Sequence, residues 1–488
     1  MKKRILTLVA ALAAAALLAA CGDKTPAVTT TDTSAGDTSV TDAETLGIPE
    51  TADYGGEAFN ILSAGNVAYA DFTADENAST PLDSAQYRRK ALVEQNYGVK
   101  IAETVEKAYS SGGGPGYKRL STDANAGDCN FDLALVAGYD VTVLAYSDYL
   151  YDLASIPGID LSKSWWDKRA NESLAVRGVM FFTTGEITVS DNNVAFVILF
   201  NKELRKAYDL NDPYSLVYDG EWTLDTFGAL CKTVTEDLDQ NGVMDANDRF
   251  GVLVWDDSVV GIVNAAGQRC CTIAEDGTIG LTLYNETTLA ALDKYFSIIY
   301  DTQYALTYQR EKVDPLEMWQ ADKGLFWMNT MDRIPQLRGM ESDFGILPYP
   351  KLNAEQQNYC TTVAPYNSQF VCVPLIQKDI ERTGIITEAL AYYGEKIVTP
   401  AYYDVNLVGQ STRDEESADM LEIIFDNLVF DIGYYYQVGP YNKQLIRMVQ
   451  ERDTNFTSMY DSYKTSAERL LTVINTYYAK AVSGWEKQ

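Results

Sequence analysis

The residues with the clearest chemical pattern lie between Asp237 and Asp248. Side-chain oxygens occupy positions 1, 3, 5, 9 and 12 of this segment, with Gly242 at position 6 and an apolar residue at position 8. This spacing is typical of an EF-hand-type calcium loop, in which oxygen ligands surround the ion. The expected ligands are Asp237, Asp239, Asn241, the main-chain carbonyl of Val243, Asp245 through a water molecule, and Asp248.

Two features distinguish this loop from a calcium sensor. Asp248 occupies the position that usually carries a bidentate Glu, and the strand-like run 250–253 follows where a second helix would stand. A sensor needs a pair of helices that can open. We therefore expect calcium to brace the loop structurally. The alternative is a turn of Asp, Asn and Gly residues whose charges are solvated.

Histidine is absent from the 488 residues. This excludes Ser-His-Asp triads, Cys-His pairs and His-containing zinc sites, because each needs an imidazole. Hydrolysis by two carboxylates remains possible. The chain has 39 Lys and Arg against 69 Asp and Glu, a formal net charge of −30, which argues against a nucleic-acid partner because such partners require a basic surface.

The N-terminus has the pattern of an exported lipoprotein. Lys2–Arg4 precede the apolar run Ile5–Ala20, and Cys21 directly follows a pair of small residues. The run of about sixteen residues is shorter than the roughly twenty that span a bilayer, which disfavours a membrane-spanning helix. Removal of residues 1–20 as a signal peptide would leave Cys21 first, and acyl chains such as palmitate on Cys21 would anchor the protein to the outside of the cell membrane.

Residues 21–56 are rich in Thr, Ser, Asp and Ala and read as a flexible tether, because they carry too little apolar surface to fold. The remaining stretch of about 435 residues exceeds one ordinary core, so we expect two domains or lobes. Cys360 and Cys372 flank a turn and could form a disulfide, although we favour free buried thiols. The same question is open for Cys129, Cys231, Cys270 and Cys271.

Strands and helices alternate along the ordered part, which predicts an α/β fold. The expected strands are 58–63, 131–136, 324–328 and 344–350, with a turn at 137–140 and a long extended region over 179–200. Helices are expected over 85–97, from Asn201 onward, and after Thr223 as N-cap. In open sheets of this class, ligands bind at the carboxyl ends of strands.

Several of these segments, taken in order, resemble the extracellular solute-binding proteins of ABC importers, in the carbohydrate-type group that includes maltose-binding protein. The segments that carry the resemblance are Phe200-Asn201-Lys202, Trp222-Thr223, Gly324-Leu325-Phe326 and Phe344-Gly345-Ile346-Leu347-Pro348-Tyr349-Pro350-Lys351. The resemblance runs from about residue 57 to the C-terminus. Each segment alone is weakly specific, and the signature rests on their combination behind the lipoprotein leader.

The resemblance implies a two-lobed, periplasmic-binding-protein-like α/β fold with discontinuous lobes and a hinge. Lobe 1 would comprise 57–193 and 366–400, and lobe 2 would comprise 194–365, with the loop 237–248, and the helical part 401–488. It also implies a monomeric binding protein, not an enzyme, that captures a carbohydrate between the lobes and presents it to permease subunits. Closure of such a hinge would be a population shift driven by the ligand.

Sugar recognition needs flat apolar faces together with carboxylates or amides for paired hydroxyls. The run Trp255-Asp256-Asp257, after the run 250–254, is the first choice for stacking and hydroxyl binding, with Trp255 and Asp256 as the residues expected to bind. The other candidates lie at strand ends or at the first crossover: Ser63, Asn66, Tyr139, Asp140, Asn193, Asn329 and Asp332. Each could instead be a core residue or a turn former.

A rival hypothesis is a secreted glycan-binding or glycoside-active lipoprotein that uses an acidic pair such as Asp256 and Asp257. Adjacent residues of a strand point to opposite faces, so this pair would be poorly placed to flank one bond. A binding protein for peptides or other polar solutes is a third reading. The sequence does not identify the sugar or its length.

Overall fold

The computed structural model describes residues 44–485, apart from residues 68, 76, 78, 79, 338 and 404–414. The predicted signal peptide, Cys21 and the first part of the tether lie outside the described residues. The described residues from Thr45 onward form one compact unit. Within the described part, no helix combines the length and the apolar character that crossing a membrane requires.

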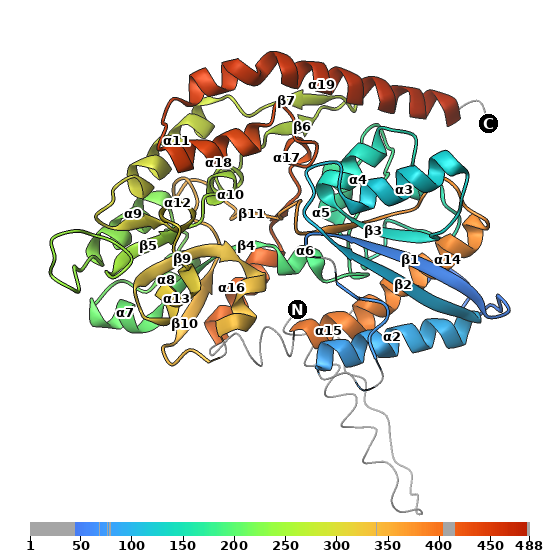
Figure 1. Ribbon diagram of the computed structural model, residues 1–488, viewed down its shortest axis with the longest axis horizontal. Coiled ribbons are helices and arrows are strands. Elements are labelled where there is room, and N and C mark those ends of the chain that lie inside the picture. The colour runs from blue at the N-terminus through green and yellow to red at the C-terminus, as the bar shows by residue number, and fades with distance from the viewer. Residues whose placement is uncertain are drawn as a thin grey trace, which may run out of the picture. The chain divides into compact units, whose positions relative to one another are not determined.

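The first lobe is built on a four-stranded sheet in the order β12-β3-β1-β2 (Figure 1). β1 pairs in parallel with β2 and β3, and β12 returns antiparallel beside β3. The strands are β1 (Glu57–Gly65), β2 (Val99–Lys107), β3 (Leu133–Ala137) and β12 (Gln369–Cys372). The helices include α2 (Pro81–Tyr97), α3 (Pro115–Ala126), α4 (Gly138–Ala145), α5 (Lys168–Leu174) and α14 (Ile380–Tyr393).

The ordered part of this lobe begins before residue 57, where the sequence placed the end of the tether. The backbone N–H groups of Ala52 and Tyr54 each donate to the last turn of α2 at 3.0 Å. The hydroxyl of Tyr97 donates to the carbonyl of Pro49 at 2.9 Å. These contacts hold the segment 49–54 against the end of α2.

The second lobe is built on a five-stranded sheet in the order β10-β4-β9-β5-β8. β4 pairs antiparallel with β9 and β10, whereas β5 pairs in parallel with β8 and β9. The strands are β4 (Phe196–Asn201), β5 (Phe250–Val254), β8 (Ala305–Thr307), β9 (Gly324–Thr330) and β10 (Phe344–Leu347). The helices include α7 (Lys202–Ala207), α8 (Pro213–Tyr218), α9 (Leu224–Thr233), α10 (Ser258–Ala265), α11 (Glu286–Ile299), α12 (Tyr308–Glu311), α13 (Pro315–Gln320), α16 (Glu415–Phe425) and α18 (Tyr441–Glu451).

Local sequence explains several of these elements. The strands β3, β4 and β9 are buried at every residue, as expected for continuous apolar runs. The side chain of Asn201 accepts the N–H of Leu204 and caps α7, and Thr223 caps α9 through a capping box. The expected turn at 137–140 is instead the start of α4, which follows β3 directly.

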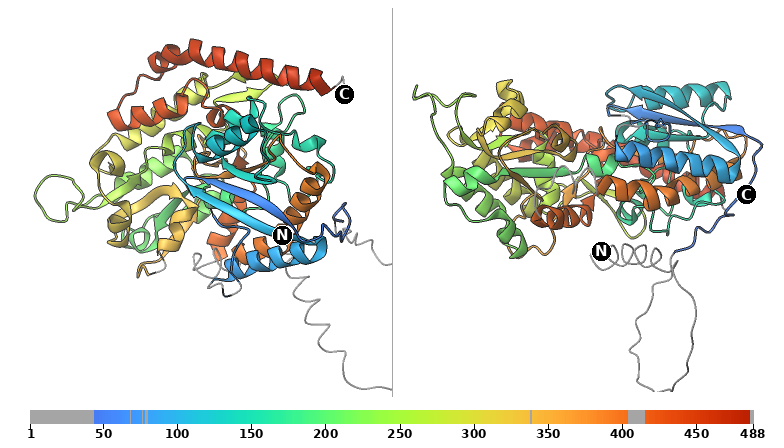
Figure 2. Two further views of the ribbon diagram at one scale, coloured as in Figure 1. Left: turned by 45° about the vertical axis from the view of Figure 1, so that its right-hand side comes forward. Right: turned by 90° about the horizontal axis from the view of Figure 1, so that it is seen from below.

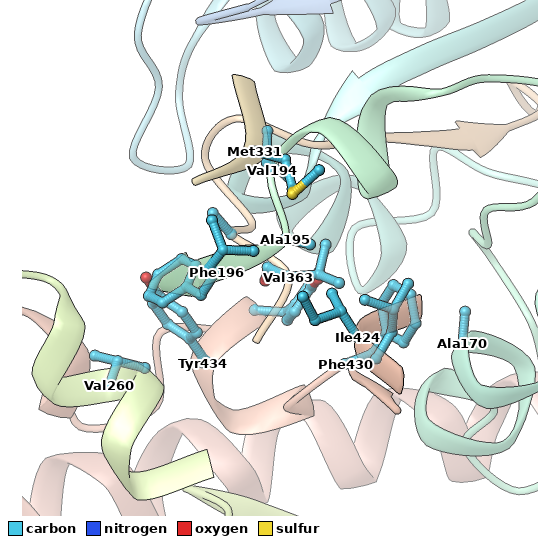
Figure 3. Packing of buried hydrophobic residues seen from close by; sticks show 14 of the residues in the cluster. Ala170, Val194, Ala195, Phe196, Val260, Met331, Val363, Ile424, Phe430 and Tyr434 are labelled. Atoms are coloured by element: carbon cyan, nitrogen blue, oxygen red, sulfur yellow. Dashed lines mark hydrogen bonds between the residues drawn. The ribbon is translucent and has the colours of Figure 1, made fainter. Parts of the chain in front are cut away.

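Segments at the boundary between the two sheets lie side by side. The chain leaves the first lobe through α6 (Ser190–Asn193) and returns after β11 (Thr361–Thr362), which pairs in parallel with β13 (Leu428–Val429). The N–H of Ala364 donates to the carbonyl of Val194, and that of Val363 donates to Val429 at 3.2 Å. Figure 3 shows the apolar packing at this boundary, which includes Val194, Ala195, Phe196, Met331, Val363, Ile424 and Phe430.

The region 179–200, which was expected to be extended throughout, therefore contains a helical turn before β4. The N–H of Asn193 donates to the carbonyl of Val189 at 3.0 Å, and the N–H of Asn192 donates to the side chain of Asp191. This turn redirects the chain toward the second sheet. The strand itself begins only at Phe196.

The C-terminal helices contact both lobes, whereas the sequence assigned 401–488 to the second lobe alone. α19 (Phe456–Trp485) extends over both lobes in Figure 1. Its Asn475 exchanges hydrogen bonds with Ile279 in the hairpin of β6 (Cys271–Ile273) and β7 (Ile279–Leu281). Its Tyr478 packs on Phe181 of the first lobe with ring centroids 5.3 Å apart.

The cysteines within the described residues are all free thiols, so Cys360 and Cys372 do not form a disulfide in this structure. Cys372 is fully buried in β12, and burial raises the pKa of its thiol. The free state agrees with the alternative that the sequence favoured.

A buried ion pair ties the N-terminal strand to α14. Arg382 and Asp132 each expose 5 % of their side chains, and a guanidinium nitrogen lies 2.6 Å from the carboxylate. Arg382 also reaches Glu57, at the start of β1, at 2.6 Å. The backbone N–H of Asn60 donates to the second oxygen of Asp132. Asp132 thus depends on one cation for charge compensation.

We expect Arg382→Met to lower the free energy of unfolding by about 3 kcal/mol, because it leaves the buried carboxylate of Asp132 without a cation. Chemical denaturation measures the change. Arg447→Met is the matched control, since Arg447 pairs with Glu451 on an exposed helix face and contributes little. Equal stability of the two variants would contradict a supporting role for the Arg382 pair.

Candidate functional site

The carboxyl end of β5 brings one predicted pair of site residues to the lobe boundary. Trp255 is half-buried and packs on Phe196, with ring centroids 4.8 Å apart. The N–H of Asp256 donates to Gln309, and the side chain of Asp256 accepts a hydrogen bond from Gln450 of α18. Asp257 follows in the turn that precedes α10.

A row of four tyrosine rings lies beside Asp257. Tyr366 is 6.5 Å from Tyr109 and 6.2 Å from Tyr139 between ring centroids, and Tyr139 is 6.2 Å from Tyr434. The charge of Asp257 contributes to a raised pKa at all four hydroxyls, after burial as the larger cause. Tyr109 and Tyr139 belong to the first lobe and Asp257 to the second, so this group spans the boundary.

Asp256 and Asp257 form an adjacent acidic pair. Burial is the main reason that the pKa of each carboxyl is raised, and the charge of Asp256 adds to burial in raising the pKa of Asp257 to about 7. The hydroxyl of Tyr366 acts in the opposite direction on Asp257. The two residues lie in the turn before α10, so their placement differs from the opposed strand faces that the sequence predicted.

A second group of polar residues meets at the first crossover. The hydroxyl of Tyr402 donates to Asn193 at 3.0 Å. Burial raises the pKa of Tyr69, with the charge of Asp332 as the next cause, while a hydrogen bond with Asn193 lowers it. Asp332 accepts the hydroxyl of Thr330 at 2.6 Å. Asn193 and Asp332, predicted independently, thus lie around the same tyrosine.

Asn66 and Asn329 lie near these groups with partners of their own. The amide of Asn66 donates to Asn367 at 2.7 Å, which joins the loop after β1 to the turn that carries Tyr366. Asn329 donates to the hydroxyl of Tyr308 at 3.2 Å, and its Oδ1 accepts the N–H of Thr330. Asn66 follows β1, as the sequence predicted, whereas Asn329 lies within β9, because that strand continues to Thr330.

Asp140 and Ser63 belong to the framework of the first lobe and not to the boundary. Asp140 is fully buried and accepts hydrogen bonds from Ser110 and from the backbone of Gly114 and Tyr117. It therefore holds the loop before α3 against α4. The hydroxyl of Ser63 is buried and donates to Glu103 on the neighbouring strand.

The sequence reasoning missed most of the residues that complete the boundary. Tyr366 lies in the turn between Cys360 and Cys372, which the sequence analysis considered only for a disulfide. The run Tyr434-Tyr435-Tyr436 and the helical residues Asn442 and Gln450 were not considered. The three adjacent tyrosines were the one available signal, since so much aromatic surface at one place is unusual for an exposed turn.

The predicted calcium loop projects from the edge of the second lobe (Figure 2). One carboxylate oxygen from each of Asp237, Asp239 and Asp248 lies within 4.8 Å of the others. Gly242 has φ +79, which permits the tight turn, and its N–H donates to Asp237 at 2.8 Å. Asp248 is fully buried and accepts the N–H groups of Leu238 and Asp245.

This arrangement fits an oxygen-ligated cation. Asp237, Asp239 and Asp248 converge from different positions of the loop, as hard divalent ions require. A β-bridge between Glu236 and Arg249 closes the base of the loop, and β5 begins directly after it. The loop is therefore joined to the sheet that also positions Trp255.

The comparisons with known proteins concern the fold. No family model matches the chain, and no curated protein matches it. Among solved structures, the ABC substrate-binding protein from Listeria monocytogenes in complex with cycloalternan covers 86% of this chain and 99% of its own, with TM-score 0.55 and 13% identity. A cyclo/maltodextrin-binding protein complexed with maltotetraose covers 85% and 96%, with TM-score 0.56 and 12% identity.

A third similar structure is the maltose/maltodextrin-binding domain from Bdellovibrio bacteriovorus bound to maltotriose, which covers 86% of this chain and 100% of its own, with TM-score 0.52 and 13% identity. The chain therefore has the fold of carbohydrate-type ABC substrate-binding proteins. The predicted two-lobed α/β fold, with its first lobe assembled from discontinuous segments, is confirmed.

Proposed function

We propose that this protein is an extracellular solute-binding protein that captures a carbohydrate, an oligosaccharide, between its lobes and delivers it to the permease subunits of an ABC importer. The observation that carries the proposal is the group of aromatic rings and carboxyls drawn from both lobes at their boundary. The fold, shared with proteins whose structures contain maltotetraose, maltotriose or cycloalternan, supports it.

The chemistry of this group suits a sugar. The half-buried indole of Trp255 offers a flat face for the C–H side of a pyranose ring, and Tyr109, at one end of the tyrosine row, exposes 61% of its surface. Asp257, Asn193 and Asp332 can satisfy hydroxyl groups, since a carboxylate accepts and an amide both accepts and donates. A guest held by both lobes would favour the closed arrangement.

The rival reading as a glycoside-active enzyme fits the geometry less well. A retaining glycosidase needs two carboxyls about 5 Å apart on opposite sides of the bond, and an inverting one needs a larger separation. Asp256 and Asp257 are adjacent in one turn, a placement that does not set them on opposite sides of one bond. Release of reducing sugar from oligosaccharides in the presence of the protein would favour the enzyme.

We expect Trp255→Ala to weaken binding of a neutral oligosaccharide by about tenfold, because one aromatic face is lost. Calorimetry and thermal stabilisation with maltotetraose, maltotriose and cycloalternan, alongside common monosaccharides, measure the effect. Tyr218→Ala, at an exposed aromatic residue on α8, is the control. Unchanged affinity would remove Trp255 from the site, and no stabilisation by any sugar would contradict the proposed function.

We also propose that acyl chains on Cys21 hold the protein at the outer face of the cell membrane. The basic residues, apolar run and small residues before Cys21 support this anchor. Cys21→Ser should move the protein from the membrane fraction to the medium, because the lipid attachment is lost. Membrane retention equal to that of the unaltered protein in cell fractionation would refute the anchor.

The loop 237–248 is proposed to bind calcium in a structural role. Its converging carboxylates, the left-handed Gly242 and its attachment to the start of β5 support this proposal. Bound calcium would neutralise the mutual repulsion of Asp237, Asp239 and Asp248 and so fix the loop.

Asp237→Ala should abolish stabilisation by calcium, because it removes a ligand at the first loop position. The unaltered protein should gain about 2.7 kcal/mol at a calcium concentration a hundredfold above the dissociation constant. The melting temperatures of the unaltered protein and of Asp237→Ala are compared in calcium and in chelator. Asp276→Ala, in the exposed turn between β6 and β7, is the control. Identical melting of the unaltered protein in calcium and chelator would disprove the site.

A further inference from the structure

Asp257, which is partly buried beside the buried Asp256, differs from the fully buried carboxyls of the described residues in what surrounds it. Asp132 faces Arg382, and Asp431 accepts the backbone N–H groups of Cys270 and Gly433. Glu388 accepts two indole N–H groups. In the described part of the chain, Asp257 has the hydroxyl of Tyr366 beside it but no N–H donor or cation.

Its neighbour Asp256 does not supply the missing charge. Asp256 has the amide of Gln450 as its side-chain donor, and a second carboxyl beside Asp257 adds repulsion. Among the described Lys and Arg residues, none forms an ion pair with this carboxyl pair. Buried charge without a partner is unfavourable, so such a pair either keeps a proton or receives a cation from outside the chain.

The aromatic surroundings favour a cation that comes from outside the chain. Four tyrosine rings follow one another beside Asp257, and within the described residues no Lys or Arg occupies the face of any of them. A cation near the face of an aromatic ring is attracted by the ring quadrupole. Carboxylates and ring faces at one place are therefore both complementary to positive charge.

Unsatisfied acceptor capacity lies in the same neighbourhood. Tyr434 exposes 1% of its surface, and its hydroxyl lies beside the hydroxyl of Tyr139. The amide of Asn442 donates to Tyr139 at 2.7 Å, while its Oδ1 is unpartnered and buried. An ammonium group has three donors and no acceptor, so it matches acceptors that the chain itself leaves unsatisfied.

We propose that the captured sugar carries a cationic amino group, as an unacetylated amino sugar does, and that this group binds between the Asp256–Asp257 pair and the row of Tyr109, Tyr366, Tyr139 and Tyr434. This inference rests on the proposed function and names its substrate class. The ammonium would donate to Asp257 and lie against the tyrosine rings. The net charge of −30 would favour the approach of such a ligand.

The test compares sugars that differ only in the amino group. Calorimetry and thermal melting of the full chain use glucosamine, galactosamine and mannosamine, each against its N-acetyl derivative and its parent neutral sugar. Glucosamine oligomers are compared in the same way with N-acetylglucosamine oligomers of equal length. We expect at least one amino sugar to bind about tenfold more tightly than its neutral partners.

Two variants that each remove one negative charge distinguish a local effect at the site from an effect of the protein's net charge. Asp257→Asn keeps the shape of the side chain and should reduce binding of the amino sugar about tenfold, with little effect on a neutral sugar. Asp128→Asn, at an exposed residue after α3, should leave both affinities unchanged. Melting without sugar verifies that both variants are folded.

The outcomes distinguish this inference from the proposed function. If neutral sugars bind and no amino sugar binds more tightly, the inference fails while the proposed function stands. An equal loss of affinity for amino and neutral sugars in Asp257→Asn also overturns the inference, because Asp257 would then bind hydroxyl groups. If no sugar of either kind binds, both proposals fail.

Discussion

The boundary between the lobes depends on three segments of chain that are hydrogen-bonded and packed side by side. Residues 194–195, 363–364 and 429–430 come from distant parts of the sequence, and apolar side chains such as Val363 and Phe430 bury their surfaces there. Polar and aromatic residues that lie within a few positions of these segments must therefore meet at the boundary. Asn193 precedes the first segment, Tyr366 follows the second and Tyr434 follows the third.

This dependence explains what the sequence could and could not predict. Apolar runs and helix caps are local signals, so β3, β9 and the cap residue Thr223 were found from their own neighbourhoods. Trp255 was found because it follows a buried strand. Tyr366 and Tyr434 meet only through the packing of segments about seventy residues apart, for which a single sequence carries no local signal.

The misplaced candidates have a common physical cause. The rule that ligands bind at the carboxyl ends of strands selects residues by position and ignores the hydrogen bonds that those residues must make inside the lobe. Asp140 follows β3, but N–H groups at the start of α3 need its carboxylate. Ser63 lies at the end of β1, but Glu103 on the adjacent strand accepts its hydroxyl. A polar side chain is available to a guest only when the framework does not require it.

Because the chain contains no histidine, buried carboxyls with raised pKa values are the side chains that titrate near neutral pH. Burial raises the pKa of Glu186, Asp191, Glu388 and Asp257 to about 7, so these groups titrate near neutrality in place of imidazoles. A carboxyl whose pKa is raised in the folded state contributes stability below its ordinary pKa, and that contribution is lost as the pH rises through about 7. For the three framework groups, hydrogen bonds from Thr399, Thr184 and two indoles limit this loss. Asp257 has the hydroxyl of Tyr366 beside it but no cation, so a positively charged guest would stabilise the ionised pair as the pH rises through about 7.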